Sequence, residues 1–208
     1  MRSNDSARYG AITQGFHWFT VVLIITLLCM GWGTDVEADE PGNSAFLWHS
    51  SLGVLVLFLA FARLLWRFFT SSPPLPVAMR RSRRIFARAV HVGLYGLLFA
   101  LPISGWLTAS AEGGTATFFG VVLPSWQGGA SGVAPPAVRP HSTESAEKEG
   151  GTASTTGEKR GEFWEEVHEV LAYVILGLAI LHTLAALKHH FVDRDDVLRS
   201  MLPGRKHR

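Results

Sequence analysis

The stretch EVHEVLAYVILGLAILHT, from Glu166 to Thr183, decides the fold of this chain. It is mostly apolar, yet it carries a histidine near each end, His168 and His182. These two histidines have the spacing i, i+14. On an α-helix they would differ by about 40° around the axis and by about 21 Å along it. One helix therefore presents two imidazoles on one face at two separate depths.

The apolar residues of the 208-residue chain are gathered into four long blocks. A bilayer core requires about 20 mostly apolar residues for each helical crossing, and every block approaches or exceeds that length. None of the blocks shows the alternation of a barrel strand. The sequence therefore predicts an all-α fold, a single membrane domain built as a four-helix bundle, with spans over residues 14–32, 46–69, 87–111 and 163–187.

Charge and cysteine content exclude several other classes of protein. The formal net charge is only +2, and the basic residues form no stripe that could follow phosphates, so we expect no nucleic-acid partner. Cys29 is the only cysteine, which excludes an intramolecular disulfide, a four-thiolate metal site and a CxxCH haem attachment. We interpret Cys29 as a buried apolar residue.

The distribution of Lys and Arg predicts how the bundle is oriented. The connection over residues 67–88 contains six arginines and no acidic residue, and the tail after the fourth block is also basic. The connection over residues 35–40 has four acidic residues and no basic one. We therefore expect both termini to be cytoplasmic.

The segment over residues 126–161 is rich in Gly, Ser, Thr, Pro and Glu, and it cannot bury much apolar surface. We expect a flexible external loop, whose lone His141 is not a metal site. Before this loop, Pro102 and Gly105 precede Trp106. We interpret them as a helix end that bends at the outer interface.

Five of the nine histidines lie inside the predicted spans. Ionisable groups in a bilayer are costly and usually face the bundle interior, so the presence of five histidines in the spans requires an explanation. An imidazole nitrogen can bind haem iron axially. Zinc is disfavoured because no histidine pair in the spans has the i, i+3 or i, i+4 spacing of two ligands on one ion. The five are His17, His49, His91, His168 and His182.

Depth in the membrane sorts these histidines into pairs. His49 and His168 each open a span on the outer side, so we expect them to form an outer pair. His17 and His182 lie toward the cytoplasmic side and form an inner pair. His91 could approach His182 at a similar depth, and helical geometry alone barely separates it from His17. A hydrogen-bonded contact between helices is the other interpretation of His91.

Basic side chains flank the inner ends of the spans. Lys188, His189 and His190 follow His182, and these three residues and His91 could contact a haem propionate or a quinone headgroup. Positive charge at a helix carboxyl end is also favoured by the helix dipole and by lipid headgroups, which we prefer as the explanation. Arg84 and Arg88 are interpreted as lipid phosphate anchors first and as propionate partners second.

Four stretches resemble the bacterial cytochrome b561 family, a group of four-helix, two-haem membrane proteins. They are FHW at Phe16–Trp18, WHSSLG at Trp48–Gly53, HVGLYGLLFALPISGW at His91–Trp106, and HTLAALKHHFVDRDDVLRSML from His182. The resemblance implies two haem b groups in a bacterial inner membrane. It places the axial ligands on His17 and His182 for one iron and on His49 and His168 for the other, and so favours His17 over His91.

Two protein ligands leave haem iron no open position, which suits electron transfer. The family resemblance implies an oxidoreductase that passes electrons to ubiquinone, with superoxide as the donor at the outer face. The outer loops show no basic patch that would attract superoxide. The alternative function is a cytochrome b subunit that anchors and serves a partner dehydrogenase or hydrogenase. A haem-free structural or transport bundle is a third possibility.

Overall fold

The computed structural model describes residues 10–33, 44–70, 81–111, 116–125, 151–194 and 197–202. Each of its four long helices is long and apolar enough to cross a membrane, which confirms the predicted fold class. The helices are α1 (Ala11–Gly33), α2 (Ser44–Phe69), α3 (Arg81–Ala111), α4 (Gly151–Phe191) and the short α5 (Val197–Met201). The strands β1 (Thr117–Phe118) and β2 (Val121–Val122) lie between α3 and α4 in the sequence.

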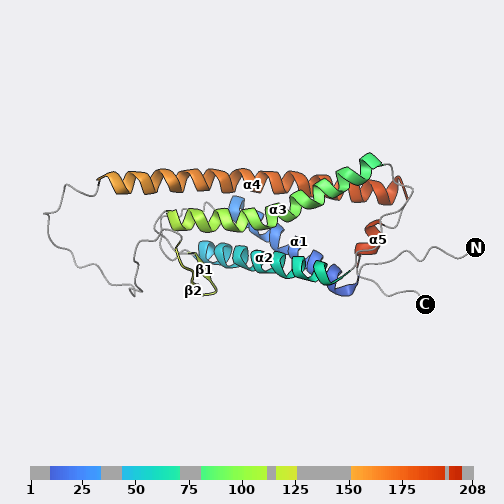
Figure 1. The fold of residues 1–208 in the computed structure, drawn as a ribbon, viewed down its shortest axis with the longest axis horizontal. Coiled ribbons are helices and arrows are strands. Elements are labelled where there is room, and N and C mark those ends of the chain that lie inside the picture. Colours follow the sequence, from blue (N-terminus) through green and yellow to red (C-terminus); the bar gives the residue numbers. More distant parts are fainter. Residues whose placement is uncertain are drawn as a thin grey trace, which may run out of the picture.

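The four long helices run alternately in opposite directions, so that α2 and α4 are parallel to each other (Figure 1). We call one end of the bundle the terminal end: α1 and α3 begin there, α2 and α4 finish there, and α5 lies beside them. The opposite end, where β1 and β2 lie, is called the hairpin end. The expectation that both chain termini are cytoplasmic stays a prediction.

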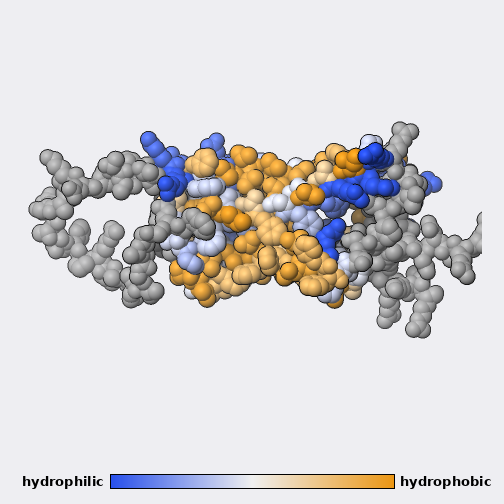
Figure 2. All heavy atoms as spheres, viewed as in Figure 1, coloured by the Kyte–Doolittle hydropathy of each residue, from blue (hydrophilic) through white to orange (hydrophobic). Residues whose placement is uncertain are grey.

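The outer surface of the bundle is apolar, as expected of a protein in lipid. Figure 2 shows hydrophobic side chains across the middle of the bundle and hydrophilic ones toward its ends. Phe58, Phe61 and Phe68 are among the exposed aromatic residues of α2. Exposing such surface to water would be unfavourable by about 25 cal/mol per Å², whereas lipid accepts it. Cys29 belongs to this surface: it is exposed on α1, so the expectation that it is buried was wrong.

Six buried apolar residues form one layer at middle depth, and each of the four long helices contributes at least one of them. We call it the apolar layer. Its members touch one another and exclude solvent between the two ends of the bundle. They are Leu23, Val56, Ala60, Leu97, Leu98 and Ile175.

Two expectations about helix ends were wrong. Helix α4 begins at Gly151, so residues 151–161 of the expected loop are helical. Adding residues to an existing helix is much easier than nucleating one, and the strongly apolar span supplies the nucleus. Helix α3 continues through Pro102 to Ala111, so Pro102 and Gly105 do not mark a helix end. His141 and the rest of the expected loop lie outside the described residues.

A small hairpin covers the hairpin end of α2. The turn between β1 and β2 places Phe119 and Gly120 at positive φ, as a two-residue hairpin turn requires. The backbone N–H of Thr117 donates to Ser50 Oγ at 3.1 Å, and that of Phe119 donates to Ser51 Oγ at 3.0 Å. The two serines that follow His49 therefore fix this hairpin directly beside it.

Helix α5 is attached to the terminal end of α1. The side chain of Gln14 is buried, and its Nε2 donates to the Ser200 carbonyl at 2.9 Å. The indole Nε1 of Trp18 donates to the Met201 carbonyl at 2.8 Å. These bonds hold the end of the described chain against the first helix, close to His17.

Candidate functional site

The structure brings the histidines together in two pairs, one at each end of the bundle. At the hairpin end, His49 on α2 and His168 on α4 have ring centres 6.2 Å apart. At the terminal end, His17 on α1 and His182 on α4 have ring centres 6.4 Å apart. We call these the hairpin pair and the terminal pair. Helix α4 contributes one imidazole to each pair because its two histidines share a face.

His91 on α3 is a third imidazole at the terminal end. Its ring centre lies 5.1 Å from that of His182, with the two rings nearly perpendicular. Its Nδ1 lies 2.6 Å from the carbonyl oxygen of Ala87, one turn earlier on the same helix. His91 therefore touches the terminal pair, but one of its nitrogens is occupied by its own helix.

Helix α3 holds the imidazole of His168 in place. Nδ1 of His168 lies 3.1 Å from the Leu101 carbonyl and 2.9 Å from the Ser104 hydroxyl. If Nδ1 carries the proton, it donates to that carbonyl and leaves Nε2 as the free lone pair. A Cβ at Gly105 would lie 3.1 Å from Cε1 of His168. The glycine is therefore needed for the ring to lie against the helix.

This support for His168 was missed in the sequence, where residues 102–106 were interpreted as a bend. A Ser-Gly step that follows a proline inside an apolar helix, at the depth of a ligand-type histidine, is the signal that could have indicated it. The partner ring is less constrained. The buried Nδ1 of His49 forms no hydrogen bond with the residues that the structure describes.

Arg63 was also missed as a site residue, although its spacing from His49 could have indicated it. His49 and Arg63 on α2 have the spacing i, i+14, the same interval that separates His168 from His182 on the parallel α4. The guanidinium carbon of Arg63 lies 5.3 Å from the centre of the Tyr95 ring on α3. A cation thus stands at the same level as the terminal pair.

The apolar layer separates the two pairs. Ile175 lies midway between the two histidines of α4, and Val56 lies midway between His49 and Arg63 on α2. The exposed fractions of Ile175 and Val56 are only 2% and 1%. The two histidine levels are therefore separated by buried apolar side chains.

The basic residues that follow His182 lie at the terminal end. Lys188 Nζ is 3.1 Å from Asp193 Oδ2, and His189 Nδ1 is 3.3 Å from the same oxygen. The ring of His190 packs against Phe191. On the first turns of α3, Arg84 is half-buried and Arg88 is exposed.

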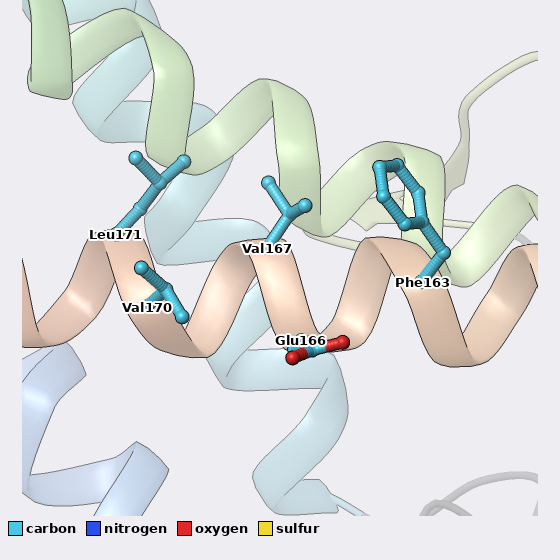
Figure 3. A pocket seen from close by; sticks show the side chains of 5 residues that line it. All are labelled: Phe163, Glu166, Val167, Val170 and Leu171. Carbon is cyan, nitrogen blue, oxygen red and sulfur yellow. The ribbon is translucent and has the colours of Figure 1, made fainter.

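A groove of about 300 Å³ lies beside the hairpin-end half of α4. Figure 3 shows Phe163, Val167 and Leu171 extending from α4 toward α3, with Glu166 and Val170 completing the lining. None of the histidines lines this groove. It is therefore separate from the two pairs.

The spacing of both pairs fits a metal ion held between two imidazoles. If the ion lay on the straight line between the two rings, two metal–nitrogen bonds of about 2 Å, plus about 1.1 Å from each nitrogen to its ring centre, would place the ring centres about 6.2 Å apart. The observed 6.2 and 6.4 Å match this value, whereas the 5.1 Å between His91 and His182 is too short for an ion in line between those two rings. Among the described residues no cluster of three or more ligand-type side chains could hold a metal ion. Two ligands per ion suit a metal whose other positions are filled by a macrocycle.

Comparison with known proteins gives consistent matches over the whole chain. The family model described as prokaryotic cytochrome b561 matches residues 8–204. The chain is 32% identical over 204 residues to cytochrome b561 homolog 2 of Escherichia coli (strain K12), covering 96% of this chain and 94% of that relative. It is 26% identical over 209 residues to the probable superoxide oxidase CybB of Yersinia pestis, covering 96% and 98%.

Proposed function

Because this chain belongs to the prokaryotic cytochrome b561 family, as the match over residues 8–204 shows, we propose a specific role for each of its membrane histidines. The family membership expected from the four sequence stretches is thereby confirmed. The chain is a bacterial integral membrane cytochrome of the b type that transfers electrons. We propose that it binds two haem b groups, one at each end of the bundle.

In this proposal His49 and His168 bind the iron of the hairpin-end haem, and His17 and His182 bind that of the terminal-end haem. The single observation that carries it is the match of both ring separations, 6.2 and 6.4 Å, to a metal between two imidazoles. His91 is not a ligand in this proposal. Its 5.1 Å separation from His182 is too short, and its Nδ1 bonds its own helix.

When bound, a haem with two imidazole ligands gains and loses one electron and offers no open position to oxygen. The residues of the chain set the conditions for that exchange. Leu101 and Ser104 orient His168, and Gly105 leaves room for its ring. The apolar layer excludes water between the two levels, which lie about 21 Å apart along α4. In this proposal the fold would set the distance between the two centres and place buried apolar side chains between them.

We propose superoxide as the electron donor at the hairpin end and ubiquinone as the acceptor in the membrane. The name of the Yersinia pestis relative, a probable superoxide oxidase, supports the donor. We propose that the terminal end faces the cytoplasm of the inner membrane, because basic residues favour that side. The described arginines at that end include Arg67, Arg81, Arg84, Arg88, Arg194 and Arg199.

At the hairpin end, Lys159 and Arg160 are the described basic residues of α4, and both are exposed. They are the candidates for attracting an anionic donor. The four glutamates on the following turns of α4 would oppose that attraction. At the terminal end, the half-buried His189 is the candidate for contact with a quinone headgroup. Lys188 and His190 are proposed to serve lipid phosphates first.

The test is the haem content of the purified protein and of five single variants, in which each membrane histidine is changed to Ala. We expect two haems per chain in the wild type and in His91→Ala. We expect at most one haem in each of the variants of His17, His49, His168 and His182. Loss of haem from the His91 variant with retention in the His17 variant would reassign the terminal pair.

Substrates are tested on the same preparation. Superoxide should reduce the haems, and ubiquinone should reoxidise them, each in the absence of other proteins. If neither reagent reacts and a dehydrogenase or hydrogenase copurifies with the cytochrome, the alternative role as a subunit of such an enzyme replaces this proposal.

A further inference from the structure

Arg63 is a positive charge inside a membrane span. It lies six residues before Phe69, the last residue of α2, and therefore about 9 Å from that helix end. Ionisable groups at such positions are costly and usually mark functional sites. A long side chain can escape by extending to the interface, but Arg63 is half-buried and its guanidinium lies over the Tyr95 ring on α3. It is turned toward the bundle.

The described part of the chain supplies no carboxylate to this cation. Its acidic residues are five glutamates in the hairpin-end half of α4 and Asp193 beyond the end of α4. Asp193 pairs with Lys188 and His189. A charge held in a low dielectric is stable only when it is paired and hydrogen-bonded. Arg63 therefore calls for an anion that the described protein residues do not provide.

The register of the helices places this cation beside the terminal pair. Helices α2 and α4 are parallel, and His49 lies level with His168, so the same i, i+14 step along each helix brings Arg63 level with His182. At the hairpin end the equivalent α2 position is the proposed ligand His49. The two levels thus differ in charge.

We propose that Arg63, positioned by the face of Tyr95, binds a propionate carboxylate of the terminal-end haem and raises the reduction potential of that haem. This inference rests on the proposed function, since it requires a haem at the terminal pair. Haem b carries two propionates, and a guanidinium binds a carboxylate through two parallel hydrogen bonds. A nearby positive charge favours the state that has gained an electron. Electrons are therefore drawn from the hairpin end toward the terminal end.

The experiment is a redox titration of the purified two-haem protein, followed by its b-type absorbance. In Arg63→Gln we expect the reduction equilibrium of one haem to fall about tenfold, which is a shift of about 59 mV for one electron. The other haem should be unchanged. Arg63→Lys should restore part of the shift, and Tyr95→Phe, which keeps the ring, should cause none. Arg67→Gln, an exposed arginine on the same helix, is the matched control.

Two further measurements separate the possible outcomes. The His182→Ala protein retains only the hairpin-end haem under the proposed function, and its potential identifies which wild-type value belongs to the terminal end. Resonance Raman spectra should show a changed propionate bending band in Arg63→Gln but not in Arg67→Gln. Selective loss of the terminal-end haem from Arg63→Gln would also support the inference.

Unchanged potentials and an unchanged propionate band in Arg63→Gln, with two haems bound, would overturn this role of Arg63 and leave the proposed ligands intact. A shift confined to the hairpin-end haem would overturn it as well. A wild-type protein without two haems would instead refute the proposed function itself.

Discussion

Changing Gly105 to Ala should weaken one haem site and leave the other intact. The added Cβ would lie 3.1 Å from Cε1 and 3.3 Å from Nδ1 of His168, so the imidazole has to move by several tenths of an ångström. That movement would strain the contacts of its Nδ1 with the Leu101 carbonyl and the Ser104 hydroxyl, which are 3.1 and 2.9 Å long. Losing one such bond costs about 1 kcal/mol, and overpacking adds about 1–3 kcal/mol.

A total on the order of 2 kcal/mol corresponds to roughly thirtyfold weaker binding of the hairpin-end haem. The assay is the rate of haem transfer from the purified cytochrome to excess apomyoglobin, with haem per chain counted at each time. One of the two haems should leave roughly thirtyfold faster than in the wild type if the change acts on dissociation. The second haem should keep its wild-type rate, and so report that the bundle remains folded.

Gly96→Ala is the matched control for this prediction. Gly96 lies on the same helix, nine residues before Gly105, and therefore about 180° away around the axis. A Cβ there would meet nothing within 4 Å, and alanine favours a helix over glycine by about 1 kcal/mol. If Gly105→Ala releases both haems as slowly as Gly96→Ala does, then His168 does not depend on this contact and the reasoning is wrong.

Three other changes test the contacts around the two sites. Ser104→Ala removes the hydroxyl from Nδ1 of His168, which should shift the potential of the hairpin-end haem alone in a redox titration, by the equivalent of about 1 kcal/mol or less. Gln14→Leu removes the bond to the Ser200 carbonyl and should speed proteolysis within residues 195–202 without changing haem content. Ser51→Ala leaves the backbone N–H of Phe119 without its acceptor, at a cost of about 1–3 kcal/mol, and should speed proteolysis over residues 112–125. The control Thr26→Ala, at an exposed position, should not change that rate.

The spans and the histidine positions could be predicted because they depend on properties that a single helix carries alone. Apolar length determines whether a segment crosses a bilayer, and an i, i+14 spacing determines that two side chains share a face. Both apply to α4 without knowledge of its neighbours. Assigning His49 to the level of His168 needed only the order of the spans. The assignment of the terminal pair required the structure as well, because His17 and His91 lie near the start of their spans at similar depths.

The parts of the fold that could not be predicted depend on contacts between distant segments. The hairpin is only two residues per strand, and its stability comes from the hydroxyls of Ser50 and Ser51, which lie on α2, far earlier in the sequence. Helix α5 has five residues, too few to form alone in water. It is held by the Gln14 and Trp18 side chains. No local sequence pattern in the hairpin, in α5 or in their partner helices predicts these contacts.

The error at residues 102–106 has a different cause. Proline and glycine usually end helices, so the local rule favoured a bend. Within α3 the helix continues, and the small side chain at 105 serves a ring on another helix. A glycine in an apolar span can mean either a break or a close approach. Only the neighbour, His168, decides between them.

The most consequential feature of the bundle is that one interval is repeated on two parallel helices. On α4 the interval joins two histidines, while on α2 it joins His49 to Arg63. If both positions of α2 carried ligands, α1 would not be needed at the terminal level and the two sites would be equivalent in charge. With arginine at the second position, the proposed terminal site takes its second ligand, His17, from α1 and has a cation that the hairpin site lacks. Under the proposed function, the repeated interval explains why the two sites are similar, and Arg63 explains why their electron affinities should differ.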